Sequence, residues 1–314
     1  MWALCFYNSC RAPDKLGRCL SIFAVAEDDF FVNSGGALYQ LHLVKAETAR
    51  ALIPKEFRLV EAFGYTLGGF FLASYEDSPA GVFDELVVIA GTVWNPPTSC
   101  AWAAKVLVNS DEACEHGRKD VGLPSQVATF SKRLTPAPQQ PPKRKNRFLS
   151  ILGFGGASAT NQMEVSVSEM NSPASADPCH INLTTFVPAE RVNKWRGPAV
   201  KLWLPSFSGR TNYNLNLLKY NCQIDCRVRA VSPLKVTKLS SHMGDITREQ
   251  EDHECRSSGV AESGRLDSME NEQNLSLSVM LSKPILALEF SCLKMQVEAP
   301  VVISHCTKSP LRYS

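Results

Sequence analysis

Apolar and polar residues alternate over short stretches of this chain, and glycine or proline separates one stretch from the next. The alternation is clear over residues 37–44, residues 101–108 alternate large and small side chains, and residues 65–75, 199–204 and 215–228 read as further strands. Successive side chains of a β-strand point to opposite faces, so this period of two predicts strands with one buried face. Many short strands with few helices predict a mainly β (α+β) protein, folded as an antiparallel β-barrel or closed sandwich.

The remaining segments complete this expected fold. Residues 45–52 predict a short helix that Pro54 ends, one of only one or two short helices that we expect. Further strands are predicted over residues 57–63, 82–94 (a pair of strands), 163–168 and 281–303, with turns at 78–81 and 205–209. Gly68 and Gly69 lie inside a strand, which indicates a bulge or a close approach to something bound.

Two stretches break the alternation. Residues 134–162 are rich in proline and contain a basic cluster at 143–147, whereas residues 237–273 are acidic. From 245 to 272 nine acids stand against three bases, with almost no large apolar side chains. Such compositions cannot bury enough surface to offset chain entropy, so we expect two disordered insertions. The basic cluster fits a solvated loop, and a nuclear or anionic-membrane address is the alternative.

Composition limits the classes of function. The 314 residues carry a net charge of +2, which gives no argument for a nucleic-acid partner. The 11 cysteines are odd in number and scattered, and no four-ligand zinc spacing is present, so we expect reduced thiols, no metal and no cofactor. The alternative is a metal site that uses Cys179, His180, His253 and Cys255.

The same observations bear on the compartment. Reduced thiols indicate an intracellular protein, of the cytoplasm or the plastid. The apolar run at 20–26 resembles a secretory signal, and the bases before it resemble a plastid transit peptide that is poor in serine. A start contributed by an alternative exon is a third explanation for this region. The longest later apolar run, 86–94, is too short to be a transmembrane segment.

Residues 116–126 contain Gly117, Gly122 and Pro124, which predict a tight turn rather than a helix. Their pattern, Gly-Arg-x-x-x-Gly-x-Pro, resembles the Gly-Arg…Pro-Lys-Lys segment of the acetoacetate decarboxylase family. In that family the residue after the proline is the lysine that forms the Schiff base. Here Ser125 and Gln126 follow, and neither side chain can form an imine. The resemblance implies an acetoacetate decarboxylase-like β fold without the family's known chemistry.

Longer stretches are similar to the plant family of neoxanthin-deficient 1 proteins. The similarity covers residues 37–50, 63–75, 78–91, 94–104 and 295–303. It implies a requirement in plants for making the xanthophyll neoxanthin, and it supplies no reaction. It also implies one acetoacetate decarboxylase-like domain over residues 36–304 with insertions at 134–162 and 237–273. We expect residues 1–35 to be an unmatched, poorly ordered segment and residues 305–314 to be a tail.

Five residues are candidates for a pocket. Glu85 corresponds to one of two acidic positions near the decarboxylase lysine, whereas the other falls near Gly69 and has no carboxylate. Ser125 and Gln126 take the place of the lysine. Arg118 is either a ligand partner or a structural donor to loop carbonyls, and Lys201 is either an inward lysine or a snorkelling one. We discount serine catalysis, because His116 on the same loop is the only histidine near Ser125.

Two functions fit these residues. The first is an accessory protein of neoxanthin biosynthesis, a non-catalytic barrel that binds an apolar carotenoid or a carotenoid-pathway enzyme. Its grounds are the missing lysine and second carboxylate and the aromatic strand set at 63–75. The second is an enzyme that opens a carotenoid epoxide by altered acid-base chemistry, with Glu85 as acid or base and Arg118 as oxyanion partner. The sequence favours the first.

Overall fold

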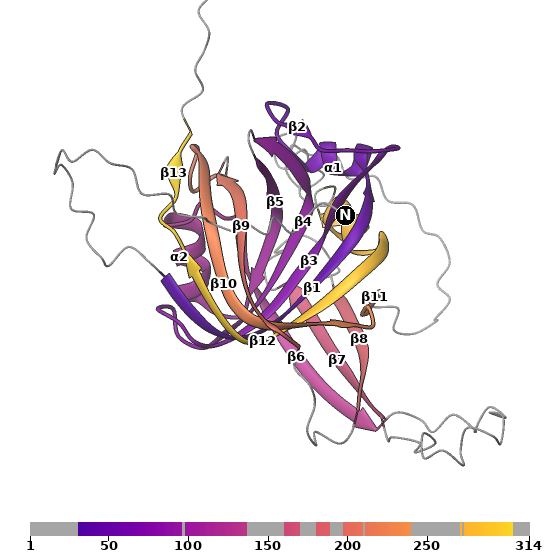
Figure 1. Ribbon diagram of the computed structural model, residues 1–314. Helices are drawn as coiled ribbons and strands as arrows, with labels where there is room; N and C mark the ends of the chain where they lie inside the picture. Colours follow the sequence, from indigo (N-terminus) through magenta and orange to yellow (C-terminus); the bar gives the residue numbers. More distant parts are fainter. Residues whose placement is uncertain are drawn as a thin grey trace, which may run out of the picture.

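The computed structural model describes residues 31–95, 98–136, 160–169, 180–188, 197–209, 211–239, 271 and 273–303. Seven long strands close into a barrel in the order β5-β9-β10-β12-β1-β3-β4, and β4 pairs back with β5 (Figure 1). They are β1 (Phe31–Lys45), β3 (Tyr65–Asp77), β4 (Phe83–Asn95), β5 (Thr98–Val108), β9 (Ala199–Gly209), β10 (Leu217–Val231) and β12 (Lys283–Val297). The prediction of a mainly β, closed barrel is therefore confirmed.

Strand β5 is the branch point between the barrel and a second sheet. One edge of β5 pairs with β4, and its other edge is shared between two strands. Ala101 and Trp102 pair with β9, whereas Val106–Val108 pair with β6. Both of these pairings are parallel, which differs from the wholly antiparallel barrel expected. The second sheet holds β6 (Ser125–Pro136), β7 (Thr160–Glu169), β8 (His180–Pro188) and β11 (Lys235–Leu239), and it projects from the barrel in Figure 1.

Two short strands extend the barrel sheet. β2 (Arg58–Leu59) pairs with the end of β4, and β13 (Val301–Val302) pairs with the start of β10. The strand predicted at residues 57–63 is thus only two residues long, followed by a bridge between Ala62 and Tyr65. The strand pair predicted at 82–94 is the single strand β4, and the turn predicted at 205–209 lies within β9.

The described part of the chain holds three helices against this framework, where one or two were expected: α1 (Ala46–Leu52), α2 (Asp111–Lys119) and a helix at 273–280. Helix α2 corrects the turn predicted over residues 116–126. Ser110 caps it by accepting a hydrogen bond from the Ala113 amide, and two acids occupy its first turn. Position 117 of the helix favours glycine, because the Cβ of any other residue would lie 2.5 Å from the Ser125 hydroxyl oxygen. The turn follows the helix, with Gly122 at a φ of 69°.

The alternation of β3 and β4 separates two sets of apolar side chains. In β4, Glu85, Val87 and Ile89 face the inside of the barrel, and the residues between them join a core on its outer side. That outer core packs against α1, the helix at 273–280 and the second sheet, and includes Ala49, Phe70, Leu86, Val165 and Leu277. The curved sheet is therefore buried on its outer face as well.

The glycine pair in β3 has a structural explanation. Gly69 has a φ of 131°, and a Cβ on it would lie 2.0 Å from the carbonyl oxygen of Gln40 in β1. A Cβ on Gly68 would lie 2.5 Å from the carbonyl oxygen of Ile89 in β4. The close approach predicted for this pair is thus the approach of the neighbouring strands.

The structure narrows both expected insertions. β6 continues to Pro136, which pairs with Asn161 of β7, so both ends of the 134–162 insertion lie in strand. β11 reaches Leu239, and Gln273 belongs to a helix, so the second insertion is also shorter than residues 237–273. Residues 31–35 of the expected N-terminal segment lie in β1 and pair with β12. The basic cluster at 143–147 and the acidic run from 245 to 270 lie outside the described residues.

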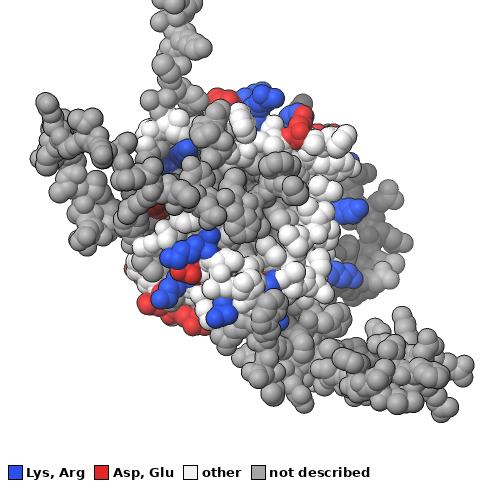
Figure 2. All heavy atoms as spheres, in the orientation of Figure 1, with Lys and Arg blue, Asp and Glu red and all other residues white. Residues whose placement is uncertain are grey.

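The described surface shows no large region of one charge on the face drawn in Figure 2. Acidic and basic side chains are interspersed on the face drawn in Figure 2, as a net charge of +2 would suggest. Within the described residues, none of the helices has the length and apolar character needed to cross a membrane.

Candidate functional site

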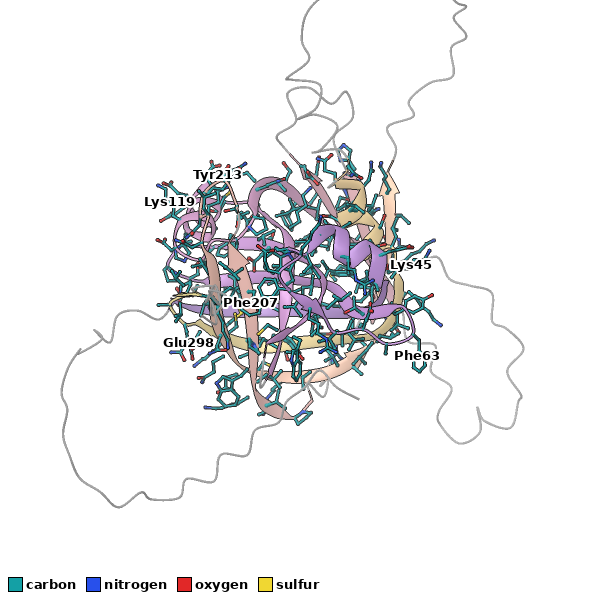
Figure 3. All side chains as sticks on the ribbon, turned by 90° about the horizontal axis from the view of Figure 1, so that it is seen from above. Lys45, Phe63, Lys119, Phe207, Tyr213 and Glu298 are labelled. Carbon is teal, nitrogen blue, oxygen red and sulfur yellow. The ribbon has the colours of Figure 1, made fainter. Side chains whose placement is uncertain are left out.

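The barrel encloses a cavity of about 2050 Å³. Side chains at alternating positions of the barrel strands line it, most of them apolar or aromatic, such as Leu41, Phe71, Val87 and Ile224. Residues of α2 and the loop after it line one part, whereas Phe63, Tyr65 and Trp94 line another. Figure 3 shows that Phe63 and Lys119 lie at opposite ends of the molecule. The cavity therefore runs the length of the barrel.

Glu85 is the acidic side chain that β4 directs into this cavity. The Tyr75 hydroxyl, on the neighbouring strand β3, donates a hydrogen bond of 2.9 Å to Oε2 of Glu85. Glu85 is half-buried by area because it faces the cavity, yet the walls around it are apolar. This desolvation raises the pKa of Glu85 to about 7, although the bond from Tyr75 acts in the opposite direction. A carboxyl of this kind can both donate and accept a proton near neutral pH.

Two further polar side chains face Glu85 from β10. Burial, followed by the charges of Cys222 and Glu85, raises the pKa of Tyr220 well above its usual value. Burial and the charge of Glu85 also raise the pKa of Cys222 to about 12. Both groups are therefore neutral hydrogen-bonding groups at physiological pH, and neither is a nucleophilic anion. Together with Tyr75, which is 1% exposed, they form a polar cluster around one carboxyl.

Ser125 also lines the cavity, at the start of β6. It is buried against Gly117 of α2, and β6 carries it beside Val106. His116 lines the cavity as well, and its Nδ1 lies 2.6 Å from the Asp120 carboxylate. Of the five candidate residues, Glu85 and Ser125 are thus the two that line the cavity.

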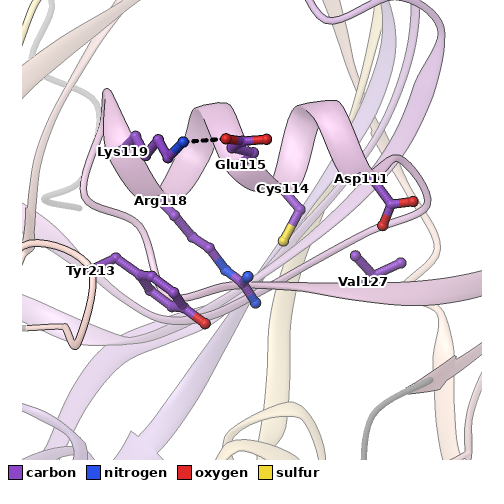
Figure 4. A pocket seen from close by; sticks show the side chains of 7 residues that line it. All are labelled: Asp111, Cys114, Glu115, Arg118, Lys119, Val127 and Tyr213. Carbon is purple, nitrogen blue, oxygen red and sulfur yellow. Dashed lines mark hydrogen bonds and ion pairs between the residues drawn. The ribbon is translucent and has the colours of Figure 1, made fainter.

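Arg118 lies outside the barrel cavity, in a cleft of about 290 Å³ beside α2. Its Nε donates a 2.7 Å hydrogen bond to the carbonyl oxygen of Ser125. Its guanidinium carbon lies 4.2 Å from the centre of the Tyr213 ring, a cation–π contact. Figure 4 shows this stack next to the ion pair of Lys119 and Glu115. The side chain therefore holds the loop after α2 in place, the structural role that sequence analysis named as its alternative.

Gln126 and Lys201 also do not line the cavity. Gln126 follows Ser125 in β6, so it points to the opposite face of the strand. Lys201 is exposed on β9 and forms an ion pair of 3.5 Å with Asp225. Gln126 is thus separated from Ser125 by strand alternation, Arg118 lies in the cleft beside α2, and Lys201 is on an exposed part of β9.

The buried lysine of the described residues is Lys105, on the outer side of the barrel. Its Nζ lies 2.6 Å from Oε1 of Glu169 in β7, and both side chains are 8% exposed or less. Gln273 donates to the other oxygen of Glu169, at 2.8 Å. An irregularity in the β4–β5 pairing turns Ala104 and Lys105 toward the same side. This group joins the second sheet and the helix at 273–280 to the barrel.

The described residues hold no group of three His, Cys, Asp or Glu side chains placed to bind a metal ion. Of the four residues weighed for a metal site, Cys179, His253 and Cys255 lie outside the described part, and His180 is in β8.

Comparison with known proteins identifies close relatives. The chain is 61% identical over 277 residues to Protein NEOXANTHIN-DEFICIENT 1 of Arabidopsis thaliana, covering 87% of this chain and 93% of that protein. It is 52% identical over 289 residues to the protein of the same name from Oryza sativa subsp. japonica, covering 90% and 92%. No protein-family model matches the chain.

Comparison with solved structures also matches acetoacetate decarboxylase from Legionella pneumophila subsp. pneumophila str. Philadelphia 1. It shares 8% sequence identity and covers 94% of this chain and 98% of that one, with a TM-score of 0.47. The sequence comparisons place this protein: the chain belongs to the family of NEOXANTHIN-DEFICIENT 1 proteins.

Proposed function

We propose that this protein supports neoxanthin biosynthesis by binding a carotenoid inside its barrel, without catalysing a reaction. The name of its relatives suggests the pathway. The single observation that supports the mode of action is the cavity of about 2050 Å³, with mostly apolar walls and a cluster of polar groups around Glu85. Sites for large apolar ligands combine such walls with a few polar groups that fix orientation.

The polar cluster orients the ligand in this proposal. Xanthophylls carry oxygen on end groups that are joined by a long apolar chain. One oxygenated end lies at Glu85, Tyr220 and Cys222, which offer a carboxyl, a phenol and a thiol. The apolar chain then extends along the aromatic and aliphatic walls toward Trp94 and Phe63. The Tyr75 hydroxyl already donates to Glu85, and a ligand oxygen placed here adds a further hydrogen bond to this cluster.

Acid-base chemistry is the second candidate, and the ionisation of Glu85 is the observation that favours it. A carboxyl with a pKa of about 7 is protonated in about half of the molecules at neutral pH. Its acid form gives a proton to an epoxide oxygen as the carbon–oxygen bond breaks. A proton then leaves a carbon of the ligand to the Glu85 carboxylate, so the step is an isomerisation without oxidant or reductant. Arg118 has no part in this version, because it lies outside the cavity.

A spectral titration of the purified protein with violaxanthin and with neoxanthin tests the proposal. Binding in a protein cavity shifts the carotenoid absorption bands, and Ala103→Trp, which places a large side chain in the cavity from β5, should weaken binding and reduce the shift. Lys201→Ala, on the outer surface, is the matched control and should leave the shift unchanged. The absence of any shift with the parent protein would sink the proposal.

Chromatography of the same mixtures separates the two candidates. Recovery of the unchanged carotenoid after incubation supports non-catalytic binding. Formation of a product by the parent protein, lost in Glu85→Gln, would replace the first candidate with the second.

A further inference from the structure

We propose that the mouth of the barrel is a membrane-docking surface, which inserts Phe63 into the interfacial region of a lipid bilayer. The mouth residues are Val60, Phe63, Tyr65, Trp94 and Ile285. The inference goes beyond the proposed function and rests on it only for the kind of ligand that enters. An apolar ligand partitions into a bilayer rather than into water, so a cavity that opens onto the bilayer receives it directly.

The mouth residues are both cavity walls and exposed surface. Of the 14 large hydrophobic residues that are exposed in the described part, seven also line the cavity. These seven are the five mouth residues together with Trp203 and Leu286. Phe63 is 101% exposed, and Tyr65 and Trp94 are more than 40% exposed. Exposed apolar patches of this kind mark sites of protein or membrane contact.

Strand register brings the mouth residues to one end of the barrel. Trp94 pairs with Arg58 of β2, and the Val60 amide donates to the carbonyl of Thr92 in the same region. Across the neighbouring strands, Tyr65 pairs with Lys45, and Leu43 of β1 pairs with both Leu67 and Lys283. Lys283 precedes Ile285 by two residues. The mouth residues on β3, β4, β12 and the segment after β2 therefore lie at the same end of the barrel, with Lys45 at the end of β1 among them.

Phe63 occupies a position that its residue type disfavours. Ala62 and Tyr65 exchange two backbone hydrogen bonds, of 2.8 and 3.0 Å, around the central pair Phe63 and Gly64. Both central residues have positive φ, 53° and 79°. Two-residue hairpin turns with positive φ at both positions favour Asn or Gly at the first. A phenylalanine held in this strained conformation, with its ring fully in solvent, points to a function outside the fold.

The tip is also held firmly. The amide of Ala46, at the start of α1, donates a 2.9 Å hydrogen bond to the carbonyl of Gly64. The hairpin therefore presents the Phe63 ring from a fixed backbone, so little conformational freedom is lost when the ring inserts.

The composition of the mouth favours a bilayer over a protein partner. Residues 45–65 and 281–286 hold five bases and three acids, a net charge of +2. Lys45 ends β1 and Lys283 begins β12 next to the apolar rim. Lys45 also forms an exposed ion pair of 3.6 Å with Glu47, and long lysine side chains can reach lipid headgroups from such positions. Trp, Tyr and Phe beside basic residues are typical of surfaces that bind the membrane interface. A protein partner on this rim would close the cavity, whereas a bilayer leaves it open to ligand.

Co-sedimentation of the full chain with phosphatidylcholine vesicles, with and without an anionic phospholipid, tests the proposal. Phe63→Asn should lower the vesicle partition coefficient at least about tenfold, because it removes one inserted aromatic ring. Asparagine also suits positive φ, so the turn and the fold should be retained. Leu215→Asn is the matched control, since Leu215 is 76% exposed but does not line the cavity. It should bind vesicles as the parent does.

Three results would overturn the docking surface: a parent protein that does not bind vesicles, an unchanged Phe63→Asn variant, or an equal loss in Leu215→Asn. Carotenoid binding is measured separately, in detergent, so that the docking surface and the proposed ligand are tested independently. Phe63→Asn should still shift the carotenoid bands there. Vesicle binding without a band shift refutes the ligand alone, and a band shift without vesicle binding refutes the docking surface alone.

Discussion

The Glu85 carboxyl makes stability depend on pH in a direction that can be predicted. Its pKa in the folded protein is about 7, against an ordinary value of 4.5. Between these values the folded state holds a proton that the unfolded chain has released, so the free energy of unfolding falls as pH rises. The contribution of Glu85 to the free energy of unfolding is fully present below pH 4.5 and is lost as the pH rises to about 7.

Glu85→Gln should remove this pH dependence, because glutamine is neutral throughout. We expect the variant to match the parent at pH 4.5 and to exceed it at pH 8 by up to about 3 kcal/mol. Urea denaturation at the two pH values measures both differences. An offset between the two proteins that is the same at pH 4.5 and pH 8 would contradict a raised pKa at Glu85.

The site residues could be predicted from sequence only where strand alternation decides the direction of a side chain. Alternation within β4 places Glu85 on the same face as Val87 and Ile89, and family resemblance singled it out. Arg118 lies in a helix that sequence reasoning took for a turn, so its direction was not predictable. Lys105 is buried through an irregularity in strand pairing, which leaves no local signal in the sequence. Tyr75 could have been found, since it shares the face of Phe71 in a strand rich in aromatic residues.

At the scale of elements, the helix at 273–280 is attached to the barrel by buried polar groups. The Gln40 amide nitrogen donates to Nε2 of His42, at 2.9 Å, and to the Leu234 carbonyl, at 3.1 Å. Its amide oxygen accepts from the Leu234 amide, at 2.7 Å. His42 in turn donates from Nδ1 to the Val279 carbonyl, at 3.2 Å, so the ring is neutral. Burial lowers the pKa of His42, which favours this neutral form.

Gln40→Leu should lower the free energy of unfolding by about 3 kcal/mol, because it leaves buried groups of His42 and Leu234 without partners. Gln223→Leu, at a partly exposed position of β10, is the control and should change it by less than about 1 kcal/mol. Chemical denaturation of the three proteins provides the comparison. Equal small effects in the two variants would show that the network contributes little.

Element types were predictable where the period was clear, and boundaries were not. Alternation predicted most of β1, a strand was also predicted over most of β3, and Pro54 correctly limited α1. Helix α2 was missed because Gly117, Gly122 and Pro124 outweighed the capping signal of Ser110 with the two acids after it. The parallel pairing of β5 with β6 and β9 could not be predicted, since a strand pattern does not indicate its partners.

At the scale of the whole molecule, three parts are joined at β5: the barrel, the second sheet and the outer helices. The buried group of Lys105, Glu169 and Gln273 connects one residue from each part. Breaking such a pair by removing one partner is costly, because a charge is left buried. The described parts of β6 and β7 end at Pro136 and begin at Thr160, which are the outer ends of these two strands.

Residues 138–158 should therefore be replaceable by a short Gly-Ser linker. Pro136 pairs with Asn161, so the two strand ends are already adjacent and a short connection can close the hairpin. A shorter loop loses less entropy on closure, so the free energy of unfolding should stay the same or rise by about 1–2 kcal/mol. Removing residues 134–162 instead should lower it by about 2 kcal/mol relative to the narrow deletion. The wider deletion removes the ladder pair of Thr135 and Gln162 as well as the contacts of β7 with the end of β8. Circular dichroism and denaturation of both variants decide the matter, and loss of β-sheet signal in the narrow deletion would show that residues 138–158 contribute to the fold.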